Sequence, residues 1–356
     1  MDCDVLIVGG GIVGVSVGAR LAQALSVTLW EAEENLGYHA SGRSAAMFET
    51  RYGPAPVIAL NRASEPDHKA GNHLSPRGLL LVGMSGEEPA FAHDCKRLGL
   101  ADLTPAEARA LCPILSDSVT RTAHTDSAQD LDTNAIQQVA LRTIRRHGGT
   151  VTAARPVERI TRLKAGWEVR SGDAVTTCRT LVNAAGAWAD RVAEMAGIAT
   201  LGLSPLRRSV ARIAAPAGQD VTAWPMLLGA GESWYAKPDA GALLVSPADE
   251  DPSEPMDAWP EDLVLAEGLA RYEAAVTTAV TRPIASWAGL RTFTPDRVPA
   301  LGRAKDMPDF VWAAGLGGYG FQSAPAAAQL VADYVLGQAP TLDADAVAAL
   351  DPGRFL

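Results

Sequence analysis

A glycine-rich motif near the start of the chain constrains its fold most strongly. Residues 5–8 form an apolar run typical of a buried parallel strand, and G-x-G-x-x-G follows at 9–14. A helix is expected to begin near Ile12, so that its N-terminal amides face the pyrophosphate of a dinucleotide. Residues 27–30 predict a second strand, and Glu31 at its end can accept hydrogen bonds from a ribose. The motif therefore predicts a Rossmann-like α/β fold and leaves open whether the ligand is NAD or FAD.

Composition narrows the classes of partner. The chain has 356 residues, a net charge of −10 and a pI of about 5.1, which argues against nucleic acid or an anionic membrane as the main partner. The four cysteines lie far apart, with no C-x-x-C, so we expect neither a disulfide framework nor a metal site, and a cytoplasmic location. No signal peptide and no apolar run long enough to span a membrane is visible, although peripheral membrane contact stays open.

Local patterns predict further elements. Residues 53–77, rich in Pro, Asn, Asp, Gly and His, are expected to be irregular. Thr104 and Glu107 form a capping box that opens a helix, and Asp132 or Thr133 is expected to cap another. Near the C-terminus a strand over 310–314 leads into a glycine cluster and then an alanine-rich helix over 323–336, an arrangement typical of an anion or ring site at a helix N-terminus.

One arginine stands out in an otherwise apolar strand. The strand is predicted over 286–293, and it carries Arg291. A buried guanidinium is costly unless it is paired. Its partner would be either a substrate carboxylate or an internal acid, and the pattern does not choose between the two.

Several stretches in a fixed order resemble a known family. They are Gly37-Tyr38-His39 with residues 42–46, Asn183 to Trp188, Lys237 to Gly241 with Ser246-Pro247-Ala248, Trp287 to Arg291, and Gly317 to Gly320. Together they resemble the FAD-dependent D-amino-acid oxidase/glycine oxidase superfamily, with the closest match to bacterial D-amino-acid dehydrogenases of the D-arginine type. The resemblance implies a discontinuous FAD-binding domain of residues 1–53, 133–204 and 296–356. It also implies a mixed-sheet substrate-binding domain of residues 54–132 and 205–295.

The resemblance also implies the cofactor and the residues that hold it. FAD would be bound non-covalently, because no cysteine lies near the glycine cluster at 315–320. The implied cofactor-binding residues are Gly9, Gly11, Ile12, Val13, Gly14, Glu31, Ala32, Ser41, Gly42, Arg43, Ser44, Ala45, Ala46, Met47, Val157, Ala185, Gly186, Trp188, Gly289, Gly317, Gly318, Tyr319, Gly320, Phe321 and Gln322.

The same resemblance implies a substrate site. Arg291 would hold a substrate α-carboxylate, Tyr235 and Arg208 would assist, and Tyr52 would lie on a loop over the pocket. The Gly318 carbonyl would accept a hydrogen bond from the substrate amine. A D-amino acid would then lose a hydride from Cα to flavin N5, and the imino acid product would hydrolyse to a 2-oxo acid.

Two positions depart from the D-arginine type. Met47 stands where those enzymes carry a histidine, and Leu79 stands where they carry an acid that would pair a basic side chain. We therefore expect a more apolar pocket and weak activity on D-arginine and D-lysine.

Other functions stay open. The substrate could be an N-substituted glycine, a cyclic imino acid or a 2-hydroxy acid, or the chain could be a flavin-binding subunit of a larger complex. The electron acceptor could be oxygen, a quinone or another protein. An NAD dehydrogenase is the least favoured alternative, because residues 42–46 and 317–322 would then have no flavin to serve.

Overall fold

The N-terminal strand lies at the centre of a largely parallel sheet. The computed structural model describes residues 1–280 and 282–355; Thr281 and Leu356, which fall within the predicted domain ranges, lie outside the described residues. Val5 pairs with Val27 on one side and with Thr180 on the other, both in parallel register. Within the described residues this first sheet has eight strands: β10 (Arg159–Arg162), β11 (Trp167–Ser171), β12 (Ala174–Asn183), β1 (Cys3–Val8), β2 (Val27–Trp30), β9 (Thr150–Thr152), β20 (Met307–Ala314) and β19 (Ala300–Ala304). The predicted Rossmann-like α/β fold is confirmed.

Helices cover both faces of the first sheet. On one face α1 (Ile12–Leu21) packs against α5 (Thr133–Arg146) and α8 (Gly320–Leu336). Gly18 permits this contact, because a Cβ there would lie 2.8 Å from the Cδ1 atom of Ile144. On the other face α6 (Ala189–Met195) covers a second buried cluster that includes Trp167 and Phe310. The motif that opens the chain is thus fixed by packing on both sides.

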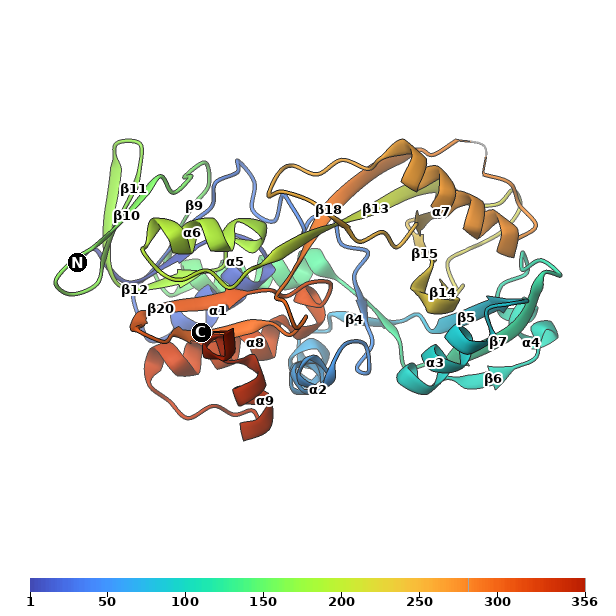
Figure 1. Cartoon of the computed structure of the whole chain (residues 1–356), viewed down its shortest axis with the longest axis horizontal. Coiled ribbons are helices and arrows are strands. Elements are labelled where there is room, and N and C mark those ends of the chain that lie inside the picture. The colour runs from blue at the N-terminus through green and yellow to red at the C-terminus, as the bar shows by residue number, and fades with distance from the viewer. Residues whose placement is uncertain (281, 356) are drawn as a thin grey trace.

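A second, mostly antiparallel sheet forms the other half of the molecule (Figure 1). The long strands β13 and β18 pair with each other and extend from the first half into the second. Within the described residues the second sheet has nine strands: β17 (Asp251–Pro252), β13 (Ser204–Ala214), β16 (Ala242–Ser246), β15 (Tyr235–Asp239), β14 (Met226–Gly229), β5 (Leu79–Met84), β7 (Val119–Thr125), β6 (Ala101–Leu103) and β18 (Ala285–Phe293). The outer helices of this half are α3 (Glu88–Leu98), α4 (Pro105–Leu111) and α7 (Asp262–Ala275).

A small sheet lies between the two halves. It consists of β3 (Met47–Phe48), β8 (Gln129–Leu131) and β4 (Leu74–Pro76). The strands of the first sheet all come from the chain segments predicted for FAD binding, and those of the second come from the other segments apart from the first residue of β13. This separation supports the two-domain division, which we retain as a proposal.

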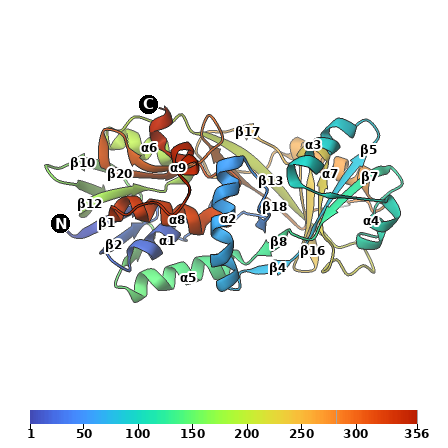
Figure 2. The same ribbon diagram turned by 90° about the horizontal axis from the view of Figure 1, so that it is seen from below.

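The prediction that residues 53–77 are irregular was wrong. They contain α2 (Ala55–Ala70) and the short strand β4. In Figure 2 α2 crosses the middle of the molecule, where it packs against α8. Its buried face includes the polar side chains of Asn61, Ser64 and His68, so the sequence lacks the apolar periodicity that marks most packed helices. Because α2 contacts α8, a helix of the predicted FAD-binding segments, we propose that this boundary lies after α2 rather than at the predicted position between residues 53 and 54.

The predicted helix caps are confirmed. The Thr104 side chain accepts a hydrogen bond from the Glu107 amide while Glu107 bonds back to the Thr104 amide, and Asp132 caps α5 by accepting from the Ala135 amide. The alanine-rich helix α8 begins at Gly320, three residues before its predicted start. The remaining helical segments are α9 (Ala344–Leu350), η1 (Gly186–Trp188), η2 (Ala230–Glu232) and η3 (Pro352–Phe355). Among the described residues, no helix has the length and apolar character needed to cross a membrane.

Candidate active site

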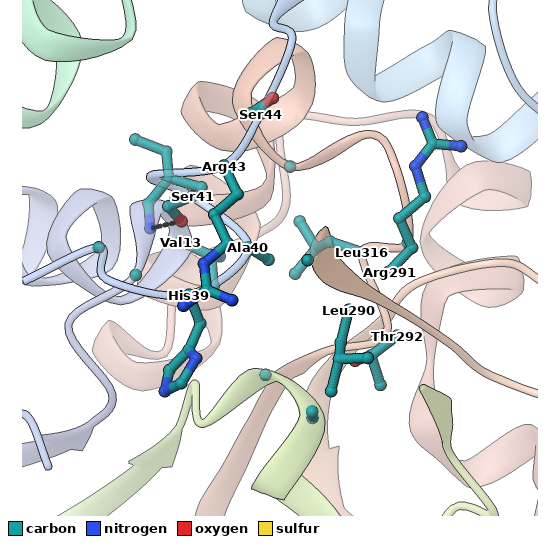
Figure 3. Close-up of a pocket in the computed structure, with 18 of the residues that line it drawn as sticks. Val13, His39, Ala40, Ser41, Arg43, Ser44, Leu290, Arg291, Thr292 and Leu316 are labelled. Atoms are coloured by element: carbon teal, nitrogen blue, oxygen red, sulfur yellow. Dashed lines mark hydrogen bonds between the residues drawn. The ribbon is translucent and has the colours of Figure 1, made fainter. Parts of the chain in front are cut away.

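A large cavity runs from the first sheet to the second. Its volume is about 610 Å³, within the range of small-molecule and cofactor sites. Figure 3 shows side chains around it from α1, from residues 39–44, from β18 and from the loop before α8. All five predicted catalytic residues line the cavity: Tyr52, Arg208, Tyr235, Arg291 and Gly318. Every predicted cofactor-binding residue also lines it except Gly14, Gly42 and Tyr319.

The three exceptions pack behind the cavity wall. A Cβ on Gly14 would lie 2.0 Å from the Gly9 carbonyl oxygen, and a Cβ on Gly42 would lie 2.5 Å from the Gly37 carbonyl oxygen. These two glycines therefore allow backbones to approach each other closely. Tyr319 is 9% exposed, and its ring packs edge-on against Tyr52 at 5.6 Å between centroids. Their roles as direct cofactor contacts stay predictions.

The nucleotide end of the cavity has the features that a dinucleotide needs. Gly11 lines it at the N-terminus of α1, and a Cβ there would meet only the Ser41 hydroxyl, at 3.3 Å, so a larger residue would extend into the cavity. The Ser41 hydroxyl accepts a hydrogen bond from the Ile12 amide at 3.0 Å, and the other early amides of α1 have no partner within the helix. The Glu31 carboxylate accepts from the Gly10 amide at 2.6 Å and retains acceptor capacity for a ribose. These residues fit a bound dinucleotide.

Arg43 has a structural role that the sequence did not reveal. Its guanidinium donates to the carbonyls of Ala258 and Ala288 at 3.1 and 2.7 Å, and it pairs with Asp257 at 2.5 Å. Arg43 therefore ties its own loop to the segment before α7 and to β18. Part of its side chain still lines the cavity (Figure 3), so contact with a cofactor stays a prediction.

Arg291 lies against the glycine loop that precedes α8. A Cβ on Gly318 would be 2.5 Å from Arg291 Cζ, so only a glycine leaves room for the guanidinium. Burial opposes the charge, but the neighbouring Tyr52 and Tyr235 hydroxyls raise the pKa of Arg291 above its ordinary value. The nearest carboxylate is Glu250, at 3.9 Å from Arg291 Nη1. The guanidinium therefore stays charged, and its ion pair with Glu250 is long enough to leave it available to a ligand.

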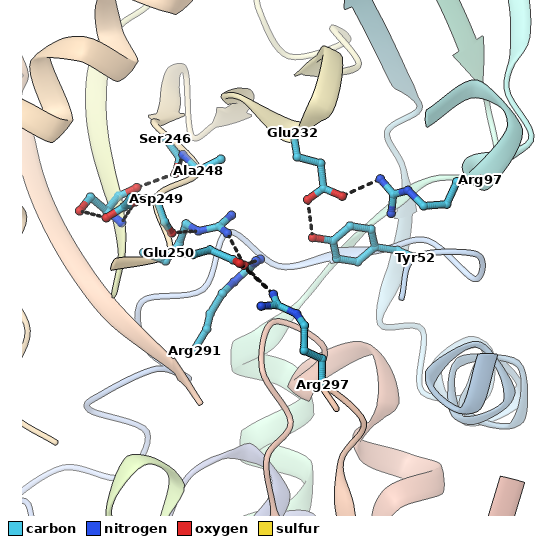
Figure 4. A network of polar contacts seen from close by, with 11 residues as sticks. Tyr52, Arg97, Glu232, Ser246, Ala248, Asp249, Glu250, Arg291 and Arg297 are labelled. Carbon is cyan, nitrogen blue, oxygen red and sulfur yellow. Dashed lines mark hydrogen bonds and ion pairs between the residues drawn. The ribbon is translucent and has the colours of Figure 1, made fainter. Parts of the chain in front are cut away.

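Tyr52 is held by two residues that sequence reasoning missed. Its hydroxyl donates to Glu232 at 3.0 Å, and Glu232 pairs with Arg97 at 2.6 Å (Figure 4). The Arg97 guanidinium also lies over the Tyr52 ring, at 5.7 Å from its centroid. Burial raises the pKa of Tyr52, so the hydroxyl stays protonated and can donate. Glu232 and Arg97 lie in η2 and α3, far from any recognised motif, and no signal in the sequence marked them.

Arg208 shares an acid with Arg291. It is 8% exposed on β13, donates to the Asp249 carbonyl at 2.8 Å and pairs with Glu250 at 3.1 Å. Burial lowers the pKa of Arg208, and repulsion from Arg291 lowers it further. Glu250 also pairs with Arg297 at 2.9 Å. One carboxylate therefore lies within ion-pair distance of the guanidinium groups of Arg208, Arg291 and Arg297 (Figure 4). This excess of positive charge favours an anionic ligand beside Arg291.

Part of the cavity wall is apolar. It contains the side chains of Met47, Leu79, Leu98, Met226 and Leu228. Met47 and Leu79 are the two positions at which the sequence departs from the D-arginine type, and both line the cavity. A ligand with one anionic end and one apolar end would complement this arrangement.

Comparison with known proteins agrees with the geometry. The sequence model of the family described as "FAD dependent oxidoreductase" matches residues 4–334. Hydrogen cyanide synthase subunit HcnC of Pseudomonas aeruginosa is 31% identical over 155 residues, covering 41% of this chain and 34% of that protein. The tRNA 5-methylaminomethyl-2-thiouridine biosynthesis bifunctional protein MnmC of Burkholderia multivorans is 25% identical over 422 residues, covering 99% of this chain and 59% of that protein. The chain thus matches about three fifths or less of the length of these two relatives.

Solved structures share the whole fold. Glycine oxidase from Geobacillus kaustophilus has a TM-score of 0.84 at 22% identity, with 98% of each chain covered. L-proline dehydrogenase from P. horikoshii has a TM-score of 0.82 at 20% identity, with 99% of this chain and 97% of that chain covered. At these identities the likeness establishes the fold alone. The family match over nearly the whole length, with a cavity whose residues fit a dinucleotide, shows that this chain belongs to the FAD-dependent oxidoreductase family.

Proposed function

We propose that the protein oxidises the Cα–N bond of a D-amino acid whose side chain is apolar. The imino acid formed would hydrolyse to a 2-oxo acid. The observation that carries this proposal is the position of Arg291, charged and half-buried beside Gly318 at the boundary between the glycine loop and the substrate half of the cavity.

The carboxylate of the substrate is proposed to pair with Arg291. A guanidinium matches a carboxylate in a bidentate geometry, and Tyr52 and Tyr235 lie close enough to influence the same charge. Arg208 assists by adding positive potential, and Glu250 limits the repulsion between the two arginines. A bound carboxylate would therefore neutralise part of the positive charge that Glu250 alone does not balance.

The amine of the substrate is proposed to donate to the Gly318 carbonyl. Held at its carboxylate and at its amine, the substrate has one remaining orientation for its Cα–H bond. Bound FAD would accept the hydride from that carbon. We propose non-covalent binding, and FAD would be held by the cavity residues of the first sheet, the 41–47 loop and the glycine loop before α8.

The side-chain preference follows from the apolar wall. Neither Met47 nor Leu79 can pair a cationic side chain, and the Glu232 carboxylate nearby is already paired with Arg97. Burying an unpaired ammonium or guanidinium costs several kcal/mol, which offsets the gain from its apolar stem. D-leucine, D-methionine or D-phenylalanine should therefore be better substrates than D-arginine or D-lysine. Closeness to the D-arginine type stays a prediction from sequence.

A second candidate is a catalytic subunit that acts on a glycine derivative or an imino acid. It is favoured by the relatives, because one is named as a hydrogen cyanide synthase subunit and the structural neighbours include a glycine oxidase and an L-proline dehydrogenase. The same Arg291 would hold the carboxylate of these substrates. We leave the acceptor of electrons as oxygen, a quinone or a protein, and we propose a cytoplasmic location because all four cysteines are free.

Anaerobic reduction of the bound flavin by a substrate panel tests the proposal. The panel contains D- and L-amino acids with apolar, acidic and basic side chains, sarcosine, both proline isomers and 2-hydroxyglutarate. Rapid bleaching by apolar D-amino acids supports the proposal. Bleaching by sarcosine or proline alone supports the second candidate, and no bleaching by any amino or imino acid contradicts both.

A further inference from the structure

A buried lysine lies directly behind the part of the cavity wall formed by residues 44–47. Lys237 is 7% exposed and does not line the cavity. Its ammonium donates to the carbonyl of Ala45 at 2.6 Å and to the carbonyl of Ala46 at 2.9 Å. It also pairs with Asp130 at 2.8 Å. The two carbonyls accept hydrogen bonds from the ammonium, and the Asp130 carboxylate offsets its charge as an ion pair.

The loop that Lys237 holds is strained. Ala46 has a φ of +43°, in the left-handed region that a residue with a Cβ rarely adopts. Such a conformation persists only when its surroundings fix it. The two carbonyls that Lys237 binds flank this residue, so removal of the ammonium would free the loop to relax. Ala45, Ala46 and Met47 all line the cavity, and a relaxed loop would change its shape.

Asp130 is itself fixed from two directions. Arg77 donates to its other oxygen at 2.8 Å from Nε and 2.6 Å from Nη2. The backbone of Asp130 on β8 pairs with Met47 on β3, so the acid is coupled to the same loop through the small sheet. Lys237, Asp130 and Arg77 together carry one net positive charge behind the wall.

Lys237 also connects this wall to the substrate half of the site. It lies two residues after Tyr235 on β15, and alternate residues of a strand share a face. Tyr235 lines the cavity and Lys237 reaches the 44–47 loop from the same strand. A single rigid strand of the second sheet therefore positions both a substrate-facing side chain and the cofactor-facing loop.

We propose that Lys237 is a positioning residue that holds the 44–47 loop in the shape that receives FAD, with Asp130 and Arg77 fixing the ammonium. The inference rests on the proposed placement of FAD beside this loop. It assigns to Lys237 a role in cofactor affinity that does not depend on which substrate the protein oxidises.

FAD titration of the apoprotein, followed by fluorescence quenching and by the visible spectrum, tests this role. Lys237→Met, which keeps the length and loses the charge, should raise the Kd for FAD about tenfold to a hundredfold, because charged hydrogen bonds are lost. It should also shift the flavin absorption bands. Lys237→Arg should recover part of the affinity. Lys69→Met is the matched control, because Lys69 is an exposed lysine paired with Glu65 on α2 and should leave the Kd unchanged.

A merely structural lysine would give a different result. Lys237→Met would then lower the unfolding temperature while FAD bound with the wild-type Kd and spectrum, and this result would overturn the proposal. If Lys237→Met does not fold, Asp130→Asn replaces it, with an expected increase in Kd of about tenfold; a wild-type Kd there would equally overturn it. No substrate is present in these titrations, so failure of the proposed reaction would be seen separately.

Discussion

Gly318 provides the space in which the Arg291 guanidinium lies. A Cβ at position 318 would be 2.5 Å from Arg291 Cζ and 2.7 Å from Arg291 Nη2. Gly318→Ala should therefore displace the guanidinium and raise the KM for the substrate about tenfold or more, since a misplaced charge pair loses more than one kcal/mol. Steady-state kinetics on the best substrate of the panel measure this. Gly241→Ala, at an exposed turn outside the cavity, is the control: its φ of +74° makes the replacement strained, so it should lower stability but leave the KM unchanged.

Arg291→Met should remove the carboxylate partner itself. Loss of a hydrogen-bonded charge pair costs about 2–5 kcal/mol, so kcat/KM should fall about thirtyfold to several-thousandfold. Arg297→Met is the control, because Arg297 pairs with the same Glu250 but does not line the cavity. An equal decrease in kcat/KM in the two variants would indicate that Arg291 acts by pairing with Glu250 rather than with a substrate carboxylate.

Glu232 should act on the substrate through Tyr52. Tyr52→Phe removes the hydroxyl that donates a hydrogen bond to the Glu232 carboxylate. We expect kcat/KM to fall about tenfold, because one hydrogen bond to a charged group is lost. Glu232→Gln keeps an oxygen that can accept from Tyr52 but removes the negative charge that pairs with Arg97. The decrease in kcat/KM should therefore be smaller than in Tyr52→Phe. In the double variant the two losses should not add, because both act on one contact. Additive losses in this cycle would show that Glu232 and Tyr52 act independently.

The apolar wall should set the side-chain preference. The double substitution Met47→His and Leu79→Glu introduces a polar group and an acid at two positions that line the cavity. The ratio of kcat/KM for D-arginine to that for D-leucine should rise about tenfold or more, since a buried cation gains a partner. Met84→His, at the end of β5 and outside the cavity, should leave the ratio unchanged. An unchanged ratio in the double variant would mean that this wall does not contact the substrate side chain.

Two histidines behind the site should make the protein sensitive to acid. Burial lowers the pKa of both His68 and His73, whose rings lie 6.0 Å apart. The unfolded chain therefore binds more protons than the native state below about pH 6.5, and the stability contributed by the neutral rings is present above that pH and lost as the pH falls. Denaturant unfolding between pH 8 and pH 5 should show this decrease, and His73→Gln should flatten it. A free energy of unfolding that is constant over this range would contradict the prediction.

The sequence predicted the elements that have local signals well. The apolar run of β1, the glycine motif and the caps at Thr104 and Asp132 each depend on neighbouring residues, and the structure confirms these elements. Resemblance to a family added the distant residues that line the cavity. Gly14, Gly42 and Tyr319, which were also assigned to the cofactor, pack behind the wall, and their cofactor contacts stay predictions.

The rest depends on contacts between distant segments. α2 was missed because its buried face is polar, with His68 bonded to the Gln322 carbonyl and Asn61 bonded to the Tyr52 carbonyl. Glu232 meets Tyr52 across 180 residues, and Lys237 meets Ala45 across 192. No periodicity or capping pattern encodes such pairs, since they arise only when the two sheets are assembled.

The most direct test of the account is a single turnover of the wild-type holoenzyme under anaerobic conditions with D-leucine, compared with L-leucine and D-arginine. We expect D-leucine to bleach the flavin fastest and to yield one equivalent each of 2-oxo acid and ammonia per flavin reduced. Bleaching without 2-oxo acid, or a faster reaction with L-leucine or D-arginine, would contradict it.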